Sequence, residues 1–490
     1  MDAELKGIWH ELAHDEPVWQ GVEASPNARA EILLKLAAGS FAVDLAALRS
    51  GPVVMNPEHG GGAFRSREIA GRIYLVPQKF ERLLDFFLRF AAGKMPPANS
   101  QEAALETMHA GRHLLLTGGP GTGKSFVLQQ FLNEKSALNN KGRPLRVTIA
   151  APTGKAAARY MQTQTGPGAI VECSTIHRVL GISHERARPR HDARNPIGCD
   201  ILIIDEISML DLGLFAALVS ALPRHAQLVL AGDLNQLPAI EGLPIDPCIG
   251  LLAEEGLLAH TALTAVRRFS VEKAEAYAAI AKAGITAIDN KTDGIRLTEM
   301  PRRELKPFLT AYAAERFCTA AAGELRLALQ TSFETSANPA ETVKAALNFL
   351  SRQIILTERR EGHFGSVSLN EQLRHHVAAQ LGSKDRTLTP IVATQNNYRL
   401  NIFNGDTGLL LHTNEGLFAV FVSAEGEIRR ISAFEFSGWE SAYALTVHKS
   451  QGSEYNDVFV ITGGAQSDDH RLLYTAVTRS RKSATVLRII

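Results

Sequence analysis

The chain has 490 residues, of which 45% are hydrophobic and 21% are charged, an ordinary balance for a globular protein. This length is too great for one hydrophobic core and predicts two to four domains. The 52 Lys and Arg residues almost cancel the 51 Asp and Glu residues, so no overall positive field indicates a nucleic-acid partner. A nucleic acid would have to bind in a local groove.

Four cysteines stand far apart, without the paired spacing of a zinc site or a disulfide framework: Cys173, Cys199, Cys248 and Cys318. The acidic N-terminus lacks the basic start and apolar core of a signal peptide. No apolar run approaches the ~18 residues that a membrane helix needs. We therefore expect a soluble, cytoplasmic protein without a structural metal.

Residues 1–97 are expected to form a small helical domain, with helices in 28–39 and 78–93 and a loop at 51–62. The helix from Lys79 to Ala92 has an apolar arc of roughly 200°, against the ~100° that a surface helix needs. Either its own chain covers this helix on two sides, or the part around Phe86 and Phe90 docks on another subunit. The stretch Gly93–Ser100 is interpreted as a linker.

After residue 98, short apolar runs alternate with helical stretches, which predicts parallel sheets. The runs lie at 113–119, 146–152, 199–206 and 226–233, and again at 443–449, 457–464 and 484–490. Two inserts interrupt this pattern. Residues 160–198 are polar and rich in Gly, Pro and Arg, and residues 387–439 have short alternating runs that predict a small β-barrel. Residues 270–345 are Ala-rich and predicted to be helical.

A glycine-rich sequence follows the first apolar run and precedes a helical stretch, the context in which a phosphate-binding loop occurs. The loop comprises Gly118, Gly119, Pro120, Gly121, Thr122, Gly123, Lys124 and Ser125. Its backbone N–H groups and the helix N-terminus would hold the phosphates of ATP. Lys124 would reach the β- and γ-phosphates, and the Ser125 hydroxyl would coordinate Mg²⁺.

Carboxylates follow the continuous apolar run at 199–206, which is typical of a strand buried on both faces. Ligands of open α/β sheets bind at the carboxyl ends of the strands. Asp205 would hold Mg²⁺ and Glu206 would polarise the attacking water as general base. Both could also cap a helix. Gln236, three residues past Asp233 on the next run, is predicted to touch the γ-phosphate or orient the water, although a plain polar turn is the alternative.

Seven further segments, in this order along the chain, together resemble the RecD-like branch of the superfamily 1 helicases. They are APTGKAAAR (151–159), STIHRVLG (174–181), IIDEISMLD (203–211), GDLNQLP (232–238), LTAVRRF (263–269), YALTVHKSQGSEY (443–455) and LLYTAVTRSR (472–481). The resemblance covers the chain from about Gln101 onward. It implies two RecA-like P-loop NTPase lobes, 98–270 and 271–490, with ATP in the cleft between them. It also implies that the insert at 387–439 is an SH3-like barrel and that 160–198 contains a pin-like element.

The resemblance further implies the residues that contact DNA, and their chemistry suits phosphate binding. In the first lobe these are Pro152, Thr153, Lys155, Thr175 and His177. A buried histidine without a DNA contact is the alternative for His177. In the second lobe they are Thr446, His448, Lys449, Ser450 and Gln451.

Two arginines are predicted to act as arginine fingers on the γ-phosphate, Arg479 and Arg268, although Arg267 competes with Arg268 for that role. Gln101 is similar to the glutamine that recognises the adenine edge in this family. The basic insert carries Arg178, Arg186, Arg188, Arg190 and Arg194 against Glu185 and Asp192. It is equally compatible with part of a strand-separating pin and with a mobile solvated loop.

The function implied is an ATP- and Mg²⁺-dependent DNA helicase that moves 5′→3′ on DNA ends. The resemblance points to the alpha subunit of a RecBCD-type exodeoxyribonuclease in double-strand break repair, with RecB- and RecC-like partners. Nuclease activity is expected only through a partner. One alternative is a stand-alone RecD-like helicase, although no helix-hairpin-helix extension is evident before Gly118. The other is a nucleotide-switched structural subunit that hydrolyses ATP without translocating.

Overall fold

The computed structural model describes most of the chain from residue 98 onward. Within 98–490 it leaves out 139–142, 159, 161–165, 167, 183–187, 241, 291, 293, 335–338, 383–387, 396, 398, 401, 414, 423–426 and 464–468. Before residue 98 it describes 22–24, 28, 32, 43–44, 53–55, 64–69, 72–77 and 80–89.

The chain divides into two compact units. The first comprises Met1–Pro152, Thr163–Leu234 and Pro238–Ala265, and the second comprises Thr153–Gln162, Asn235–Leu237 and Val266–Ile490. The division at Ala265/Val266 lies five residues before the boundary at 270/271 that the sequence predicts. Two short segments of the first half of the chain, 153–162 and 235–237, group with the second unit.

The first unit is built on a six-stranded parallel sheet with the order β11-β6-β10-β9-β7-β8. Its strands are β6 (Leu114–Gly118), β7 (Leu145–Ala151), β8 (Ala169–Thr175), β9 (Ile201–Ile204), β10 (Gln227–Gly232) and β11 (Ala259–Leu263). All four apolar runs predicted in this region form strands. Every residue of β9 and β10 is buried, as expected for a parallel sheet covered on both faces.

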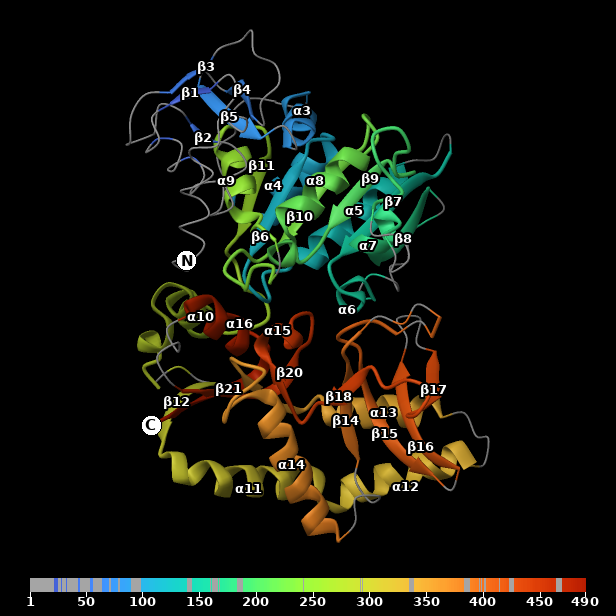
Figure 1. The fold of residues 1–490 in the computed structure, drawn as a ribbon. Helices are drawn as coiled ribbons and strands as arrows, with labels where there is room; N and C mark the ends of the chain where they lie inside the picture. Colours follow the sequence, from blue (N-terminus) through green and yellow to red (C-terminus); the bar gives the residue numbers. More distant parts are fainter. Residues whose placement is uncertain are drawn as a thin grey trace. The chain divides into compact units, whose positions relative to one another are not determined.

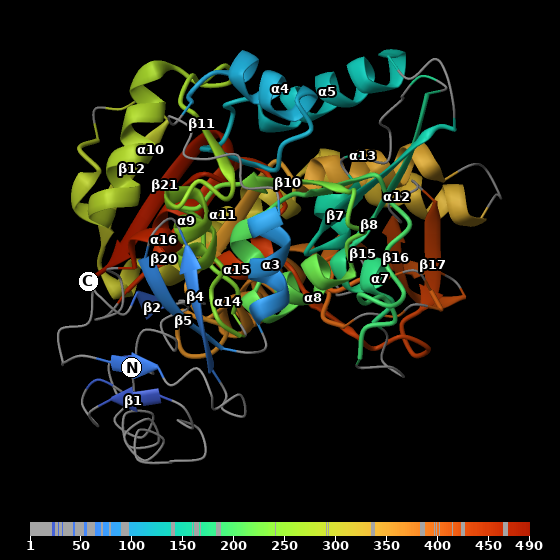
Figure 2. The ribbon, with the colours of Figure 1, turned by 90° about the horizontal axis from the view of Figure 1, so that it is seen from above.

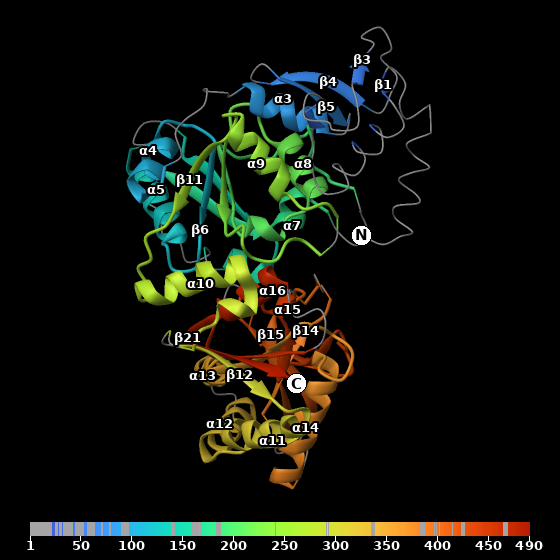
Figure 3. The same cartoon turned by 90° about the vertical axis from the view of Figure 1, so that its left-hand side faces the viewer.

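Helices cover both faces of this sheet. On one face lie α4 (Gln101–His109) and α5 (Lys124–Leu138), and on the other lie α8 (Leu212–Ala221) and α9 (Asp246–Glu254), as Figures 2 and 3 show. The order of the strands reverses around β6 and β10, because β7 does not lie beside β6. Such a switch point leaves room for a ligand beyond the carboxyl ends of the strands.

The N-terminal region differs from the predicted helical domain, because the structure describes five strands there. They are β1 (Val22–Ala24), β2 (Val43–Asp44), β3 (Val53–Met55), β4 (Phe64–Ile69) and β5 (Arg72–Pro77), paired antiparallel in two small sheets. The predicted loop at 51–62 contains β3, and the predicted helix at 28–39 lies largely outside the described residues. The second predicted helix is confirmed as α3 (Glu81–Arg89).

Helix α3 packs on α8 of the first unit, which explains its wide apolar arc (Figure 3). Phe86 is buried, and its ring stacks on that of His113 with centroids 4.9 Å apart. Phe87 lies 6.3 Å from the ring of Phe215 on α8. The prediction that Phe86 docks on another subunit is therefore wrong, since this chain already covers it. Phe90 lies outside the described residues.

The predicted insert at 160–198 is partly regular structure. Its residues 169–175 form β8, which pairs with β7 in parallel, and α7 (Ile176–Leu180) follows directly. The alternation of polar and apolar side chains hid this strand, because β8 is an edge strand and alternates in exposure. The predicted linker also ends inside the fold, since Ala98 forms a bridge to Thr261 of β11 and Ser100 caps α4.

The second unit contains a five-stranded parallel sheet with the order β12-β21-β20-β13-β19, of which Figure 1 labels β12, β21 and β20. Its strands are β12 (Ile295–Met300), β13 (Gln353–Thr357), β19 (Ala444–Thr446), β20 (Tyr455–Thr462) and β21 (Ser480–Ile489). One face packs on α10 (Val271–Ala283) and α16 (His470–Val477), and the other on α11 (Leu305–Phe317) and α14 (Ser366–Leu381). The two units thus share one architecture, confirming the predicted pair of parallel α/β lobes.

An antiparallel sheet of five strands interrupts the second unit where the sequence predicts a β-rich insert. Its order is β17-β16-β15-β14-β18, with β14 (Thr389–Ala393), β15 (Thr407–Thr413), β16 (Gly416–Val422), β17 (Ile428–Ser432) and β18 (Trp439–Ser441). Helices α12 (Ala320–Glu334) and α13 (Ala340–Leu350) pack on β15. Among the described residues the edge strands β17 and β18 do not pair with each other, so closure into an SH3-like barrel is not confirmed. Within the same residues, no helix is both long and apolar enough to cross a bilayer.

Candidate functional site

The phosphate-loop candidate connects β6 to α5 at the carboxyl edge of the first sheet. Gly121 and Gly123 have φ angles of 74° and 90°, which glycine adopts without steric cost. A Cβ on Gly123 would lie 2.5 Å from Nε2 of Gln101. The loop conformation therefore depends on glycine at this position, and α5 begins directly after it at Lys124.

Two side chains of the loop bond to its own backbone. Lys124 Nζ donates to the carbonyl oxygens of Gly118 at 2.6 Å and Gly119 at 3.1 Å. The buried Thr122 hydroxyl donates to the same Gly119 oxygen at 2.9 Å. The lysine ammonium thus lies over the loop, beside the start of α5, where a loop of this kind binds phosphate.

Gln101 is the first residue of α4, whose N-cap Ser100 accepts a hydrogen bond from the Ala103 amide. Its side-chain Nε2 donates to the Thr122 carbonyl at 3.1 Å. This contact places Gln101 beside the phosphate loop, although the two are 21 residues apart in sequence. Its predicted role toward adenine stays a prediction.

Asp205 and Glu206 follow β9 at the same edge of the sheet as the phosphate loop. Strand β10 pairs with both β6 and β9, so the loop and the carboxylates leave the sheet on either side of it. The Asp205 amide donates to the Ala150 oxygen at 2.9 Å, and Asp205 Oδ1 accepts from the Glu206 amide at 2.9 Å. Both side chains are buried.

Glu206 has a left-handed backbone, with φ 56° and ψ 45°. This conformation costs a non-glycine residue about 1–3 kcal/mol and concentrates at functional sites. Glu206 occupies the N-cap position of the 3-10 helix η3 (Ile207–Met209), yet its side chain makes no capping hydrogen bond. Helix capping therefore does not explain this carboxylate.

Gly232, which the sequence analysis did not single out, permits this arrangement. A Cβ at Gly232 would lie 2.7 Å from Cγ1 and 2.9 Å from the amide nitrogen of Ile207. The end of β10 therefore approaches η3 too closely for any side chain. The only signal in the sequence is a glycine at the end of an apolar run, before the buried Asp233.

The residues predicted to hold Mg²⁺ suit it chemically. Ser125 offers an exposed hydroxyl in the first turn of α5, and Asp205 offers a carboxylate at the end of β9. Mg²⁺ prefers oxygen ligands and usually retains several waters beside substrate phosphates. Within the described part of the chain, no group of three or more His, Cys, Asp or Glu residues could hold a metal alone. A magnesium ion here would thus depend on nucleotide oxygens.

Gln236 groups with the second unit, in the short segment 235–237. It is buried. Its neighbour Leu237 donates its amide hydrogen to Thr475 Oγ1 at 2.9 Å and accepts from Gln451 Nε2 at 3.3 Å.

Three of the DNA-contact candidates lie in the first unit: Pro152 after β7, and Thr175 and His177 at the start of α7. Thr175 caps this helix by accepting a hydrogen bond from the Arg178 amide. His177 is exposed, which contradicts the alternative of a buried histidine. The carboxyl end of β8 thus presents an exposed histidine and an exposed Arg178 beside each other.

Lys155 lies in the short helix α6 (Gly154–Ala158), which begins two residues after Pro152. Thr153 Oγ1 accepts from the Ala156 amide at 3.2 Å and so caps the helix. The Lys155 ammonium donates to Ser453 Oγ at 2.8 Å within the second unit.

Among the second-unit DNA candidates, most side chains already have partners in the protein. Thr446 caps α15 (Val447–Ser450), and Lys449 forms an ion pair with Glu440. Ser450 is fully buried and donates to the Val447 oxygen at 2.7 Å, which contradicts a direct DNA contact by its hydroxyl. Gln451 is also buried. Burial lowers the pKa of the half-buried His448, which favours its neutral form.

The two predicted arginine fingers differ in their surroundings. Arg479 is buried at the start of β21, and its Nε donates to the Thr475 oxygen at 3.1 Å. Arg268 makes a bidentate ion pair with Glu454, at 2.8 and 2.6 Å. This hydrogen bonding to Glu454 raises the pKa of Arg268 further. Arg267, the competing candidate, is exposed.

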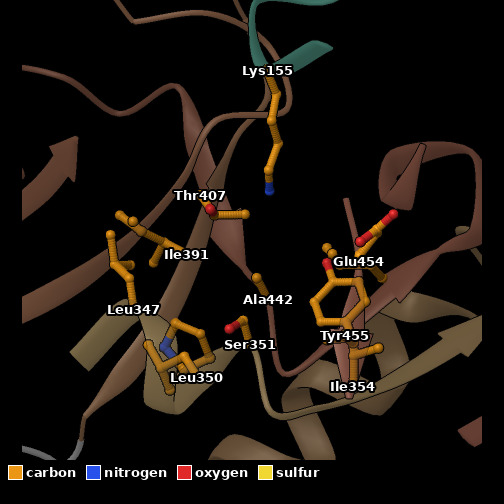
Figure 4. Close-up of a pocket in the computed structure, with 13 residues that line it drawn as sticks. Lys155, Leu347, Leu350, Ser351, Ile354, Ile391, Thr407, Ala442, Glu454 and Tyr455 are labelled. Carbon is orange, nitrogen blue, oxygen red and sulfur yellow. The ribbon is translucent and has the colours of Figure 1, made fainter. Parts of the chain in front are cut away.

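A small cavity of about 60 Å³ lies in the second unit beneath Lys155 (Figure 4). Its walls are mostly apolar side chains of α13 and neighbouring strands, including Leu347, Leu350 and Ile391. Lys155 points into it from one side, and Glu454 lies on its rim across from Leu347 and Ile391 (Figure 4).

A glycine-dependent phosphate loop, a buried Asp-Glu pair beside it and the parallel sheet that positions both define a P-loop nucleoside triphosphatase. Two family models match the chain in agreement with this class. An AAA domain matches residues 101–241, and a UvrD-like helicase C-terminal domain matches residues 441–487.

Three relatives are RecD proteins by name, and one of them is named as a DNA helicase. The RecBCD enzyme subunit RecD of Mycolicibacterium smegmatis is 30% identical over 79% of this chain and 70% of the relative, and that of Mycobacterium tuberculosis is 30% identical over 76% and 66%. The ATP-dependent RecD2 DNA helicase of Deinococcus radiodurans is 31% identical over 78% of this chain and 48% of the relative. The chain thus spans about two thirds of the mycobacterial proteins and about half of RecD2. It belongs to the RecD family of DNA helicases.

Proposed function

We propose that this chain is an ATP-dependent DNA helicase motor, moving 5′→3′ as the RecD-type subunit of a RecBCD-type helicase–nuclease. The proposal of an ATP-driven motor rests on the phosphate loop, which lies with Asp205 and Glu206 at one edge of the first sheet. Membership of the RecD family supports DNA as the polymer along which the motor moves. The mycobacterial relatives, named as RecBCD subunits, support assembly with RecB- and RecC-like partners.

In this proposal the first unit binds ATP and activates water. Backbone amides of the loop and Lys124 hold the phosphates, and Gln101 lies beside them for the adenine. Ser125 and Asp205 hold Mg²⁺, which supplies charge neutralisation for the phosphates when bound. Glu206 accepts the proton of the attacking water, and burial keeps its carboxylate away from competing solvent.

The residues of the second unit supply positive charge and contacts to DNA. Arg479 and Arg268 are assigned to the charge that develops on the γ-phosphate, and Gln236 to the attacking water. Lys155 of the second unit and His177 of the first unit are assigned to DNA phosphates, since both carry donors on short helices. Such contacts bind the backbone of DNA and imply little sequence preference.

The experiment is steady-state ATP hydrolysis with and without oligo-dT, followed by unwinding of duplexes with either a 5′ or a 3′ single-stranded tail. A DNA motor hydrolyses ATP faster with oligo-dT and unwinds only the 5′-tailed duplex. Hydrolysis that ignores DNA would identify a nucleotide-switched structural subunit instead. Unwinding of the 3′-tailed duplex alone would refute the polarity.

A stand-alone helicase is the second candidate, because RecD2 of Deinococcus radiodurans is as similar in sequence as the mycobacterial subunits. Native purification from the source cells separates the two. A RecBCD-type subunit should co-purify stoichiometrically with two larger chains and with ATP-dependent exonuclease activity. A stand-alone helicase should elute alone and unwind DNA unaided.

A further inference from the structure

One turn of the second unit, residues 451–454 between α15 and β20, contacts three segments from earlier in the chain. These segments follow β7, β10 and β11 of the first sheet: 153–162, 235–237 and 266–270. All three group with the second unit. Each also carries a predicted functional residue, namely Lys155, Gln236 and Arg268. We call residues 451–454 the junction turn.

Each residue of the junction turn meets one of these segments. Gln451 Nε2 donates to the Leu237 oxygen at 3.3 Å. Gly452, with φ 73°, lies beside the first segment, where a Cβ would be in van der Waals contact with Thr153 Oγ1 at 3.4 Å. Ser453 is buried, and its Oγ accepts a hydrogen bond from Lys155 Nζ at 2.8 Å.

Glu454 makes the strongest of these contacts. Both of its oxygens accept from the Arg268 guanidinium, at 2.8 and 2.6 Å, and Oε2 also accepts from Arg481 Nε at 3.1 Å. A bidentate pair fixes the plane of a guanidinium as well as its position. The Glu454 side chain is only 26% exposed and lies on the rim of the cavity below Lys155 (Figure 4).

We propose that Glu454 is a positioning residue for ATP hydrolysis: its carboxylate orients Arg268, and through the junction turn it links Arg268 to Lys155. This inference rests on the proposed function, in which Lys155 contacts DNA and Arg268 contacts ATP. The two residues lie 113 positions apart but bond to adjacent residues, Ser453 and Glu454. The junction turn therefore provides one short path between the DNA contact and the nucleotide contact.

The contacts of the junction turn differ in how readily a DNA phosphate can replace them. Lys155 bonds to a neutral hydroxyl, whereas a DNA phosphate would offer it a charge-assisted bond that is roughly twice as strong. DNA is therefore expected to draw the Lys155 ammonium away from Ser453. Arg268 is held by a carboxylate in a bidentate pair and keeps its orientation. DNA binding thus removes one contact of the junction turn, the hydrogen bond from Lys155 to Ser453, while the pair of Glu454 with Arg268 remains.

The test is Glu454→Gln, which keeps the size of the side chain and removes its charge. With saturating oligo-dT, kcat for ATP hydrolysis is expected to fall on the order of 10²-fold, as for a misplaced catalytic group. KM for ATP should stay within about twofold, because a contact made only in the transition state affects kcat. Glu454→Asp, which retains the charge but shortens the reach, should fall between wild type and Glu454→Gln.

A double-mutant cycle shows whether Glu454 acts through Arg268. The Arg268→Ala/Glu454→Gln double variant should be no slower than Arg268→Ala alone, since residues that act as a unit are not additive. The matched control is Glu299→Gln, which removes another arginine partner of this unit, Arg488 at 3.6 Å, and should leave hydrolysis unchanged. Thermal unfolding of each variant verifies that it is folded.

Three outcomes would overturn the inference: an unchanged kcat in Glu454→Gln, a multiplicative loss in the double variant, or a raised KM with unchanged kcat. The last would mean that Glu454 binds substrate directly. If the wild-type chain hydrolyses ATP without any stimulation by oligo-dT, the proposed function itself fails, and the failure is recognised before any variant is compared.

Discussion

The two α/β units share an architecture but position their candidate residues in different ways. In the first unit the phosphate loop, Asp205 and Glu206 directly follow buried strands, and backbone geometry places them at one edge of one sheet. In the second unit several candidates are held by other side chains, as Arg268 is by Glu454 and Lys449 by Glu440. A site positioned by the backbone tolerates few changes at its glycines. A site positioned by side chains depends on charges far away in sequence.

The difference also separates what each unit contributes to hydrolysis. In the proposed function, the first unit binds the nucleotide and activates water, and the second contributes the arginines and part of the contacts to DNA. Substitutions in the first unit should therefore affect ATP turnover with or without DNA. Substitutions in the second unit should differ from one another in how strongly they change the stimulation of ATP turnover by DNA.

The largest effect is expected for Arg479→Ala in the second unit. If Arg479 is an arginine finger, ATP turnover falls about 10³-fold or more. Arg488→Ala is the matched control, because Arg488 is an exposed arginine on β21 that pairs with Glu299 at 3.6 Å rather than with Glu454. Steady-state hydrolysis with saturating oligo-dT measures both. Hydrolysis near the wild-type rate in Arg479→Ala would assign catalysis to the first unit alone.

Glu206→Gln should lower ATP turnover nearly as much as Arg479→Ala, while ATP binding stays intact. Loss of a general base costs on the order of 10²-fold or more in kcat, whereas the phosphate loop and Asp205 are untouched. Equilibrium binding of a fluorescent ATP analogue and single-turnover hydrolysis measure the two effects separately. Glu172→Gln, an exposed carboxylate on β8 of the same sheet, serves as the control. Weakened binding in Glu206→Gln would instead give Glu206 a role in holding the nucleotide.

Acid is expected to destabilise the first unit through His113. Burial lowers the pKa of this histidine from 6.5 to about 4, so the unfolded chain binds more protons between these values. The free energy of unfolding therefore falls as pH drops, by about 2 kcal/mol between pH 7 and pH 5. Urea unfolding of the wild type at both pH values measures the loss.

The exposed His177 offers a control for this pH effect. His177→Gln should keep the pH dependence of the wild type, while His113→Gln should reduce it, although it lowers stability at pH 7. If His113→Gln keeps the full pH dependence, another group causes the acid sensitivity.

The smallest effect is expected for Lys155→Ala. On single-stranded DNA the slope of log K against log salt is about −0.7 per neutralised phosphate, so the variant should lose roughly one such increment for every DNA sequence. Fluorescence anisotropy with labelled oligo-dT between low and high salt provides the slope. Ser453→Ala, which removes the partner of Lys155 but no charge, should keep it. An unchanged slope in Lys155→Ala would leave Lys155 a role within the second unit only.

The sequence by itself determined the phosphate loop, the Asp-Glu pair and the strands that present them. These features are local, because a strand, a loop and a helix start lie within about a dozen consecutive residues and their spacing reflects backbone geometry. The same locality made α3 and the β-rich insert predictable. Local patterns did not predict β8, because exposure of one face gave this strand a polar sequence.

Only the tertiary structure decided what surrounds the candidates in the second unit. Ser450 belongs to a polar row in the sequence, yet the structure buries it completely. Phe86 has the pattern of a docking face, but α8 and His113 cover it. Arg268 and Glu454 are 186 positions apart, and Lys155 and Ser453 are 298 apart. No local pattern encodes such pairs, because only the packing of the folded chain brings residues so distant in sequence together.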